Sequence, residues 1–222
     1  MTTGILDLAA GRALGSAAVL LFMTVLAMAA AKRISTCIQL FSAQCAVITA
    51  LVLAMAYVRR SPEAYIVAGM ILAIKVLAIP YALTRIVRSL QAPRDVTAST
   101  TAAQSVFIAS GLILLSFFAI EPYARVLRVD EDMLAAAVAL VLTGAFLMVS
   151  RKKALMQVVG LLVLENGIFL AALTTTFGMP LIIEIGIFFD LLMGVFLMGL
   201  FVFRIRDTFD HLDVSKLRKL RG

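Results

Sequence analysis

Side chains that bind cofactors are scarce in this sequence of 222 residues. It has one histidine, His211, two cysteines, Cys37 and Cys45, and no tryptophan. The cysteines are eight residues apart in one expected helix, about 12 Å along its axis, which is too far for a disulfide. The sequence contains no Cys-x-x-Cys pair, no paired histidines and no glycine-rich nucleotide loop. We therefore expect no catalytic residue, cofactor or metal in this chain, because haem, iron–sulfur and nucleotide sites need such motifs.

Charged residues are also few, and nearly all of them lie between long apolar runs. Charged residues make up 15% of the sequence and hydrophobic residues 63%, and the mean hydropathy is +1.06. This composition is typical of a polytopic membrane protein. The net charge of +7 would suggest nucleic acid binding in a soluble protein, but here the basic residues flank apolar runs, as they do in cytoplasmic loops. We therefore expect the lipid bilayer, and no nucleic acid, as a partner.

Seven apolar runs are long enough to cross a bilayer, so the sequence predicts an all-α fold with seven transmembrane helices. The run from residue 85 to 101 is the longest linker and divides the chain into two expected membrane halves, 1–102 and 103–222. The connection 150–153 is so short that the helices on either side should be antiparallel neighbours. The predicted spans are 13–31, 34–58, 64–87, 103–120, 133–149, 155–177 and 180–203.

The distribution of basic residues predicts the orientation of these helices. The loops after the first, third and fifth spans and the C-terminal tail 204–222 carry 14 Lys and Arg residues, whereas the opposite side carries five. Cytoplasmic loops are enriched in Lys and Arg. We therefore expect the N-terminus outside, a basic C-terminal tail in the cytoplasm, and a multi-pass location in the cytoplasmic (inner) membrane.

Apart from Arg85 near the end of the third span, four charged side chains lie within the predicted spans. A charged group at the centre of a membrane helix costs roughly 2.5–3.5 kcal/mol on insertion scales, so such residues usually mark an ion or proton path. Glu165 and Asp190 are each 12 residues from an expected turn after Phe177, so an antiparallel hairpin would place them level, about 18 Å from the turn. The predicted proton-path residues are Lys75, Glu165, Asp190 and, at a shallower depth, Glu184.

Other polar and helix-breaking residues are expected to support this path. Pro80 follows Lys75 and should kink the third span and free a carbonyl. Asn166 and Gln157 share the sixth span with Glu165. In the second span Gln39, Ser42 and Gln44 can form hydrogen bonds to neighbouring helices, and Gly160, Gly167, Gly186, Gly194 and Gly199 permit close helix approach.

A structural interpretation of the same residues stays open. Lys75 and one acid can form a pair that fixes helix register without moving any ion. Glu184, four residues after Pro180, can also be an anion placed near a helix start, where the helix dipole favours negative charge.

Four segments of the sequence carry a resemblance to a known family: Gln157-x2-Gly160-x4-Glu165-Asn166-Gly167, Glu184-Ile-Gly-Ile-x2-Asp190, Lys75-Val-Leu-x2-Pro80 and Leu212-Asp213-Val214-x2-Leu217. The chain resembles component E of formate hydrogenlyase-type (hydrogenase-4), membrane-bound group-4 nickel–iron hydrogenases. Its last three helices, residues 133–203, are similar to the K subunit of complex I and the C subunit of multisubunit cation/proton antiporters. In that wider family a Gly-Leu-Glu sequence supplies a proton-path glutamate, where this chain has Leu162 and carries Glu165 three residues later.

The resemblance implies a membrane-arm subunit without a catalytic centre of its own. Such a subunit lies between the redox module, which faces quinone or ferredoxin, and the antiporter-like subunits, and helps to couple electron transfer to proton or sodium movement. Three alternatives stay open: a subunit of a cation/proton antiporter without a hydrogenase, a structural scaffold of the membrane arm, and a seven-helix photoreceptor. Against the photoreceptor, the membrane lysine is in the third span, and there is no tryptophan to wall a retinal pocket.

Overall fold

The computed structural model describes residues 2–60, 62–89, 98–127 and 129–175 and, beyond these, only positions 186 and 194. The chain divides into two compact units, residues 1–184 and 185–222, and the account below concerns the first. The predicted seventh span, 180–203, and the basic tail, 204–222, fall outside the described residues, apart from those two positions.

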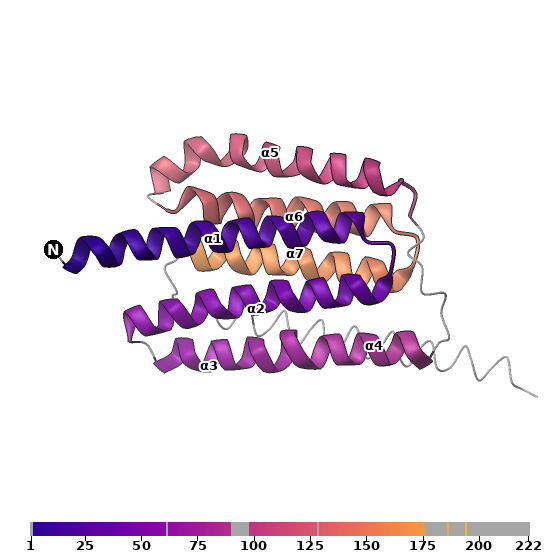
Figure 1. The fold of residues 1–222 in the computed structure, drawn as a ribbon, viewed down its shortest axis with the longest axis horizontal. Coiled ribbons are helices and arrows are strands. Elements are labelled where there is room, and N and C mark those ends of the chain that lie inside the picture. Colours follow the sequence, from indigo (N-terminus) through magenta and orange to yellow (C-terminus); the bar gives the residue numbers. More distant parts are fainter. Residues whose placement is uncertain are drawn as a thin grey trace, which may run out of the picture. The chain divides into compact units, whose positions relative to one another are not determined.

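The regular elements in the described part of the first unit are all helices (Figure 1), and an isolated β-bridge joins Ala98 to Arg151. Because η1 is a π-helix continuous with its neighbours, α3, η1 and α4 together form one candidate span, Pro62–Arg88. The predicted all-α class is confirmed for these residues. The elements are α1 (Thr2–Ala30), α2 (Ile34–Arg59), α3 (Pro62–Ile71), η1 (Leu72–Ala78), α4 (Ile79–Ser89), α5 (Ala102–Leu127), α6 (Glu131–Ser150) and α7 (Ala154–Thr175).

Five helices of the described residues are long and apolar enough to cross a membrane, and Leu14–Ala30 in α1 is a shorter apolar helix. These six coincide with the first six predicted spans. Large apolar side chains on α5 face outward, among them Phe107, which is 82% exposed. Such exposure is unfavourable in water, whereas lipid tails cover it in a bilayer. The chain is therefore a multi-pass membrane protein.

The fourth span is longer than predicted. The sequence predicted a helix over 103–120 and a loop over 121–132, but α5 continues to Leu127 with Pro122 inside it. The apolar part ends at Tyr123, so the charged residues mark where the helix leaves the apolar layer and not where its hydrogen bonds end. The next helix begins sharply, because the Asp130 carboxylate accepts a hydrogen bond from the Met133 N–H at 2.9 Å and caps α6.

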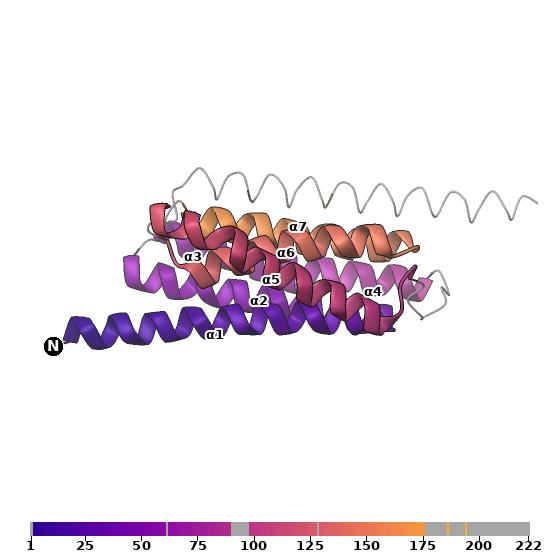
Figure 2. The same ribbon diagram turned by 90° about the horizontal axis from the view of Figure 1, so that it is seen from above.

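The helices run side by side in this unit (Figures 1 and 2). Helix α6 packs along α7, as predicted from the short connection between them, and α1 contacts α2, α5 and α6. Helix α2 contacts α7 on one side and the α3–η1–α4 rod on another. Residues of η1 and α7 can therefore meet next to α2.

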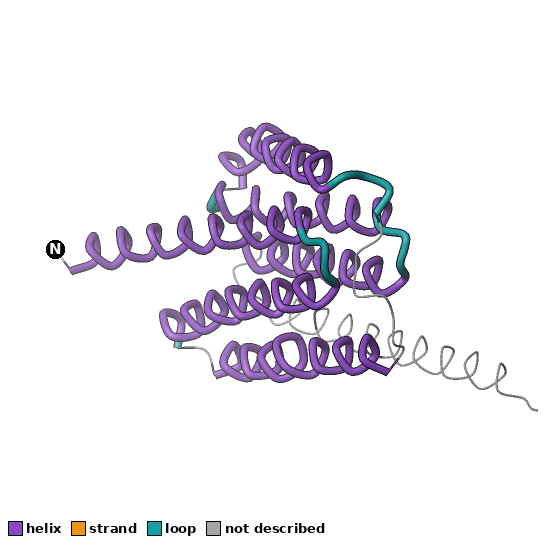
Figure 3. The backbone as a smooth tube through the Cα atoms, turned by 45° about the vertical axis from the view of Figure 1, so that its right-hand side comes forward, coloured by secondary structure: helices purple, strands orange, loops and turns teal. Residues whose placement is uncertain are grey.

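The loops that were predicted to share the cytoplasmic side lie at one end of the helices (Figure 3). The Arg151 guanidinium donates to the carbonyls of Met28 at 3.4 Å and Ala29 at 2.9 Å, at the end of α1. The Ser99 N–H donates to the Ser150 carbonyl at 2.9 Å, which brings in the chain before α5. The predicted grouping is thus confirmed for the described parts of these loops, whereas the tail 204–222 lies outside the described residues.

Arg151, one of the basic residues counted in the connection 150–153, is buried. Only 4% of Arg151 is exposed, and this burial lowers the pKa of its guanidinium from the ordinary value. Lys152 beside it is exposed. Arg151 can be buried because its guanidinium donates to carbonyls in the last turn of α1, where the helix has no further N–H groups of its own; the Met28 carbonyl also accepts from the Ala31 N–H at 3.3 Å.

Glycines bring α6 and α7 into backbone contact. A Cβ on Gly160 would lie 2.7 Å from the Met148 nitrogen and 2.9 Å from the Gly144 oxygen, and one on Gly167 would lie 2.7 Å from the Ala137 oxygen. The close approach predicted at Gly160 and Gly167 is confirmed. Gly144, which the sequence analysis did not single out, is equally tight, with Leu164 N at 2.5 Å from a Cβ.

We predict that Gly160→Ala separates α6 from α7 and lowers the free energy of unfolding by about 1–3 kcal/mol, the usual penalty for overpacking. The measurement is thermal unfolding in mild detergent. Gly111→Ala is the matched control, because nothing lies within 4 Å of a Cβ at this helical position in α5. Equal melting temperatures for the two variants would contradict the close packing.

Candidate functional site

A buried ion pair joins η1 to α7. The Lys75 Nζ atom lies 2.9 Å from Glu165 Oε1, and the two side chains are 4% and 7% exposed. The sequence analysis placed both residues near the middle of their spans, at comparable depth. The structure shows that they meet, although they are 90 residues apart in the chain.

Asn166 completes the surroundings of the lysine. Lys75 Nζ donates to Asn166 Oδ1 at 3.2 Å, and the Phe169 ring lies 5.6 Å from the same nitrogen. A carboxylate, an amide oxygen and an aromatic face all favour a cation. Glu165, Asn166 and Phe169 come from less than two turns of α7, so one helix face contacts the ammonium.

Hydrogen bonds continue from Asn166 into α2 and α1. The Asn166 Nδ2 group donates to Gln44 Oε1 at 3.1 Å and to Cys45 Sγ at 3.2 Å. Gln44 Nε2 donates to Thr24 Oγ1 at 3.3 Å, and the Thr24 hydroxyl donates to the Leu21 carbonyl at 2.7 Å. Gln44 and Asn166 are 0% and 1% exposed. These hydrogen bonds form one continuous polar cluster that extends from η1 through α7 and α2 to α1. Its members are Thr24, Gln44, Cys45, Lys75, Glu165 and Asn166.

The lysine lies in the middle of the π-helix. In an α-helix the Val76 carbonyl would accept from residue 80, which is proline and has no N–H. The Ser42 hydroxyl of α2 donates to this carbonyl at 3.0 Å. This is the carbonyl that Pro80 was predicted to free, and the predicted hydrogen bond from Ser42 to a neighbouring helix is confirmed. The π-helical turn is a feature that proteins often place at functional sites.

Another predicted residue, Gln157, lies away from Lys75 and Glu165. Gln157 is exposed near the start of α7 and donates to the Arg151 carbonyl at 3.0 Å. It is eight residues before Glu165, about 12 Å along the helix, so it supports the α6–α7 connection and not the cluster. Asp190 and Glu184 lie outside the described residues.

The sequence analysis missed Thr24 and Cys45 as members of the cluster. A threonine in an apolar helix usually bonds its own backbone, as Thr49 and Thr143 do here, so residue type alone carries no signal. Gln44 was recognised only as a general hydrogen-bonding residue. Its burial and its link to Asn166 depend on how α2 and α7 are rotated about their axes.

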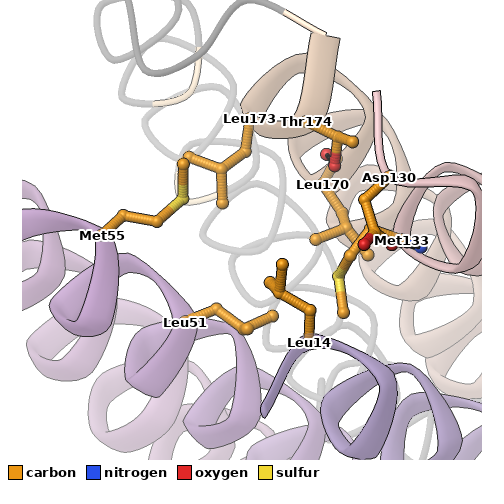
Figure 4. A pocket seen from close by; sticks show the side chains of 8 residues that line it. All are labelled: Leu14, Leu51, Met55, Asp130, Met133, Leu170, Leu173 and Thr174. Carbon is orange, nitrogen blue, oxygen red and sulfur yellow. Dashed lines mark hydrogen bonds between the residues drawn. The ribbon is translucent and has the colours of Figure 1, made fainter. Parts of the chain in front are cut away.

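An apolar cavity of about 230 Å³ lies between α1, α2, α6 and α7 (Figure 4). Leu170 in its wall is four residues after Asn166, about 6 Å along the same face of α7. Asp130 and Thr174 are the polar residues of the lining. The cavity therefore begins one turn from the cluster, on the side toward Asp130. Its lining residues are Leu14, Leu51, Met55, Asp130, Met133, Leu170, Leu173 and Thr174.

The geometry supports proton chemistry in the cluster. Within the part of the chain that the structure describes, no three His, Cys, Asp or Glu side chains lie close enough to hold a metal ion. What the cluster offers is an acid and an amine in contact, away from water, each of which stabilises the charged form of the other. A change in the distance between them therefore changes the protonation of both.

Comparison with known proteins identifies a relative of this chain. No family model matches the sequence, and no solved structure matches it. The sequence is 36% identical over 167 residues to the uncharacterized protein Rv0085 of Mycobacterium tuberculosis (strain ATCC 25618 / H37Rv), and the match covers 74% of this chain and 76% of that protein. The chain therefore belongs to the same family as the uncharacterized protein Rv0085.

Proposed function

We propose that this chain is a membrane subunit of an energy-converting hydrogenase or complex I-like oxidoreductase, in which Lys75 and Glu165 form part of a proton or sodium path. The observation that carries the proposal is the buried 2.9 Å contact between Lys75 and Glu165. A buried ion pair is weak evidence for stability, because its desolvation offsets much of its attraction. Ionisable pairs inside membranes are more often functional.

The pair can couple a movement to a proton. While Lys75 touches Glu165, both groups keep their charges. When the lysine moves away, the carboxylate is left in an apolar surrounding and takes up a proton; when the contact returns, the proton leaves. Electron transfer in another subunit would supply the free energy for that movement.

The π-helix supports this scheme, because it places Lys75 in a backbone segment that differs from a regular α-helix. The hydrogen bond from Ser42 to the Val76 carbonyl attaches that segment to α2, in addition to the ion pair that attaches it to α7. In the proposed function, Asp190 and Glu184 continue the path in the last span, and neighbouring membrane-arm subunits provide its further steps.

Purification of the tagged full-length chain in mild detergent tests the assembly. We expect nickel–iron hydrogenase subunits and antiporter-like membrane subunits to co-purify, and an untagged strain is the control. Antiporter subunits without any hydrogenase or redox subunit would favour the cation/proton antiporter instead. Recovery of this chain without other membrane subunits would contradict the proposed function.

A further inference from the structure

The hydrogen bonds that connect Lys75 to α1 all run in one direction. Lys75 donates to Asn166, Asn166 donates to Gln44, Gln44 donates to Thr24, and Thr24 donates to the Leu21 carbonyl. Each of the two amides has a donating and an accepting end. Each amide could therefore be reversed without a change in shape, and its neighbours decide its orientation.

At the α1 end of this series of hydrogen bonds, the direction of donation is fixed. A backbone carbonyl can only accept, so the Thr24 hydroxyl proton points to Leu21 at 2.7 Å. The Thr24 oxygen then has lone pairs for the Gln44 NH2 group and no proton to offer to it. The Gln44 oxygen is thereby turned toward Asn166, whose NH2 group must face it.

We propose that Thr24 and Gln44 are positioning residues that hold the Asn166 amide with its oxygen, and not its NH2 group, against the Lys75 ammonium. A reversed Asn166 would direct N–H groups at the cation and its oxygen at the Gln44 oxygen. Both contacts are repulsive, and neither group can turn to water, because Gln44 and Asn166 are buried. The contact of Asn166 Nδ2 with Cys45 Sγ favours the same orientation. Any effect of this orientation on ion movement rests on the proposed function, whereas the orientation itself does not.

Two substitutions of Thr24 separate this role from simple packing. Thr24→Val keeps the volume and the methyl group but removes the acceptor, whereas Thr24→Ser keeps the hydroxyl and loses a methyl. We expect Val to lower the melting temperature in detergent by about 2–4 °C, the shift expected from one lost buried hydrogen bond in a chain of this size. Ser should stay close to the parent protein. A packing role predicts the opposite order, and that order would overturn the proposal.

A second measurement tests whether Thr24 acts through Lys75. In a Lys75→Met background a reversed Asn166 meets no cation, so both amides can reverse together. We therefore expect the melting shift caused by Thr24→Val to shrink to half or less. The two side chains are three hydrogen bonds apart and a packing role would leave their effects additive. Additive shifts would overturn the proposal.

Ion uptake into vesicles, measured per electron transferred, separates this proposal from the proposed function. We expect Thr24→Val to lower uptake severalfold and Thr24→Ser to restore it. Non-additive melting shifts together with unchanged uptake would support the positioning role and would count against the ion path.

Discussion

Replacing Lys75 with Met should remove ion coupling and destabilise the protein by about 3–5 kcal/mol, because it leaves the buried Glu165 carboxylate without its cation. Part of this loss should be relieved by protonation of Glu165, which then drops out of the path. The measurements are thermal unfolding in detergent and ion uptake into vesicles per electron transferred. Lys75→Arg is the gentler variant, since it keeps the charge but cannot release a proton.

The double variant Lys75→Met, Glu165→Leu distinguishes a functional pair from a structural one. Replacing both members of a buried ion pair with apolar side chains is often neutral or stabilising, so most of the lost stability should return. Ion uptake should remain absent, because no titratable group is left at this point. Normal uptake in the double variant would show that the pair serves only to hold η1 against α7.

Glu165→Gln should abolish proton movement and, like Lys75→Met, lower the stability, because it leaves the buried Lys75 ammonium without its counter-charge. Asp190→Asn should abolish proton movement while the complex still assembles. Both substitutions keep the size and hydrogen bonding of the side chain and remove its titration. If the two acids belong to one path, the double substitution should be little worse than either single one, because residues that act as a unit give strongly non-additive losses. The comparison needs complexes of equal abundance and a measured ratio of ions to electrons.

Glu184→Gln is the matched control for this series. Its predicted position is nearer the membrane surface and wetter, so the same chemical change should reduce ion uptake less. A normal ratio of ions to electrons in the Glu165→Gln, Asp190→Asn protein would leave the acids without a part in the path and would favour the scaffold.

The membrane spans could be predicted because hydropathy over 20 residues is a strong signal that needs no knowledge of neighbours. The importance of Lys75 and Glu165 could be predicted for a similar reason, since one ionisable group in an apolar run is conspicuous. Their comparable depth followed from counting residues. These inferences use position along the chain, which the sequence contains directly.

The rotation of each helix about its axis could not be predicted. These helices are apolar on nearly all sides, so no polar stripe indicates which face is buried. The link from Gln44 to Asn166 and the inclusion of Thr24 depend on that rotation. The burial of Arg151 depends on where α1 ends in space, and nothing in the sequence distinguishes it from Lys152. The π-helix at Leu72–Ala78 was not predicted either, because the sequence analysis expected Pro80 to kink the third span and the structure shows a π-helical segment before it.

The separation of Lys75 and Glu165 in the chain has a consequence for synthesis in the membrane. The two residues are 90 positions apart, so at 5–20 residues per second the ribosome makes the lysine roughly 5–18 s before the glutamate. During that interval the third helix holds an ammonium whose counter-charge does not yet exist, at a cost of about 2.5–3.5 kcal/mol that its apolar neighbours must offset. A nascent chain that stops before α7 keeps this unmatched charge in the lipid. The Lys75–Glu165 ion pair can therefore form only in a chain whose synthesis has included α7, the sixth membrane span.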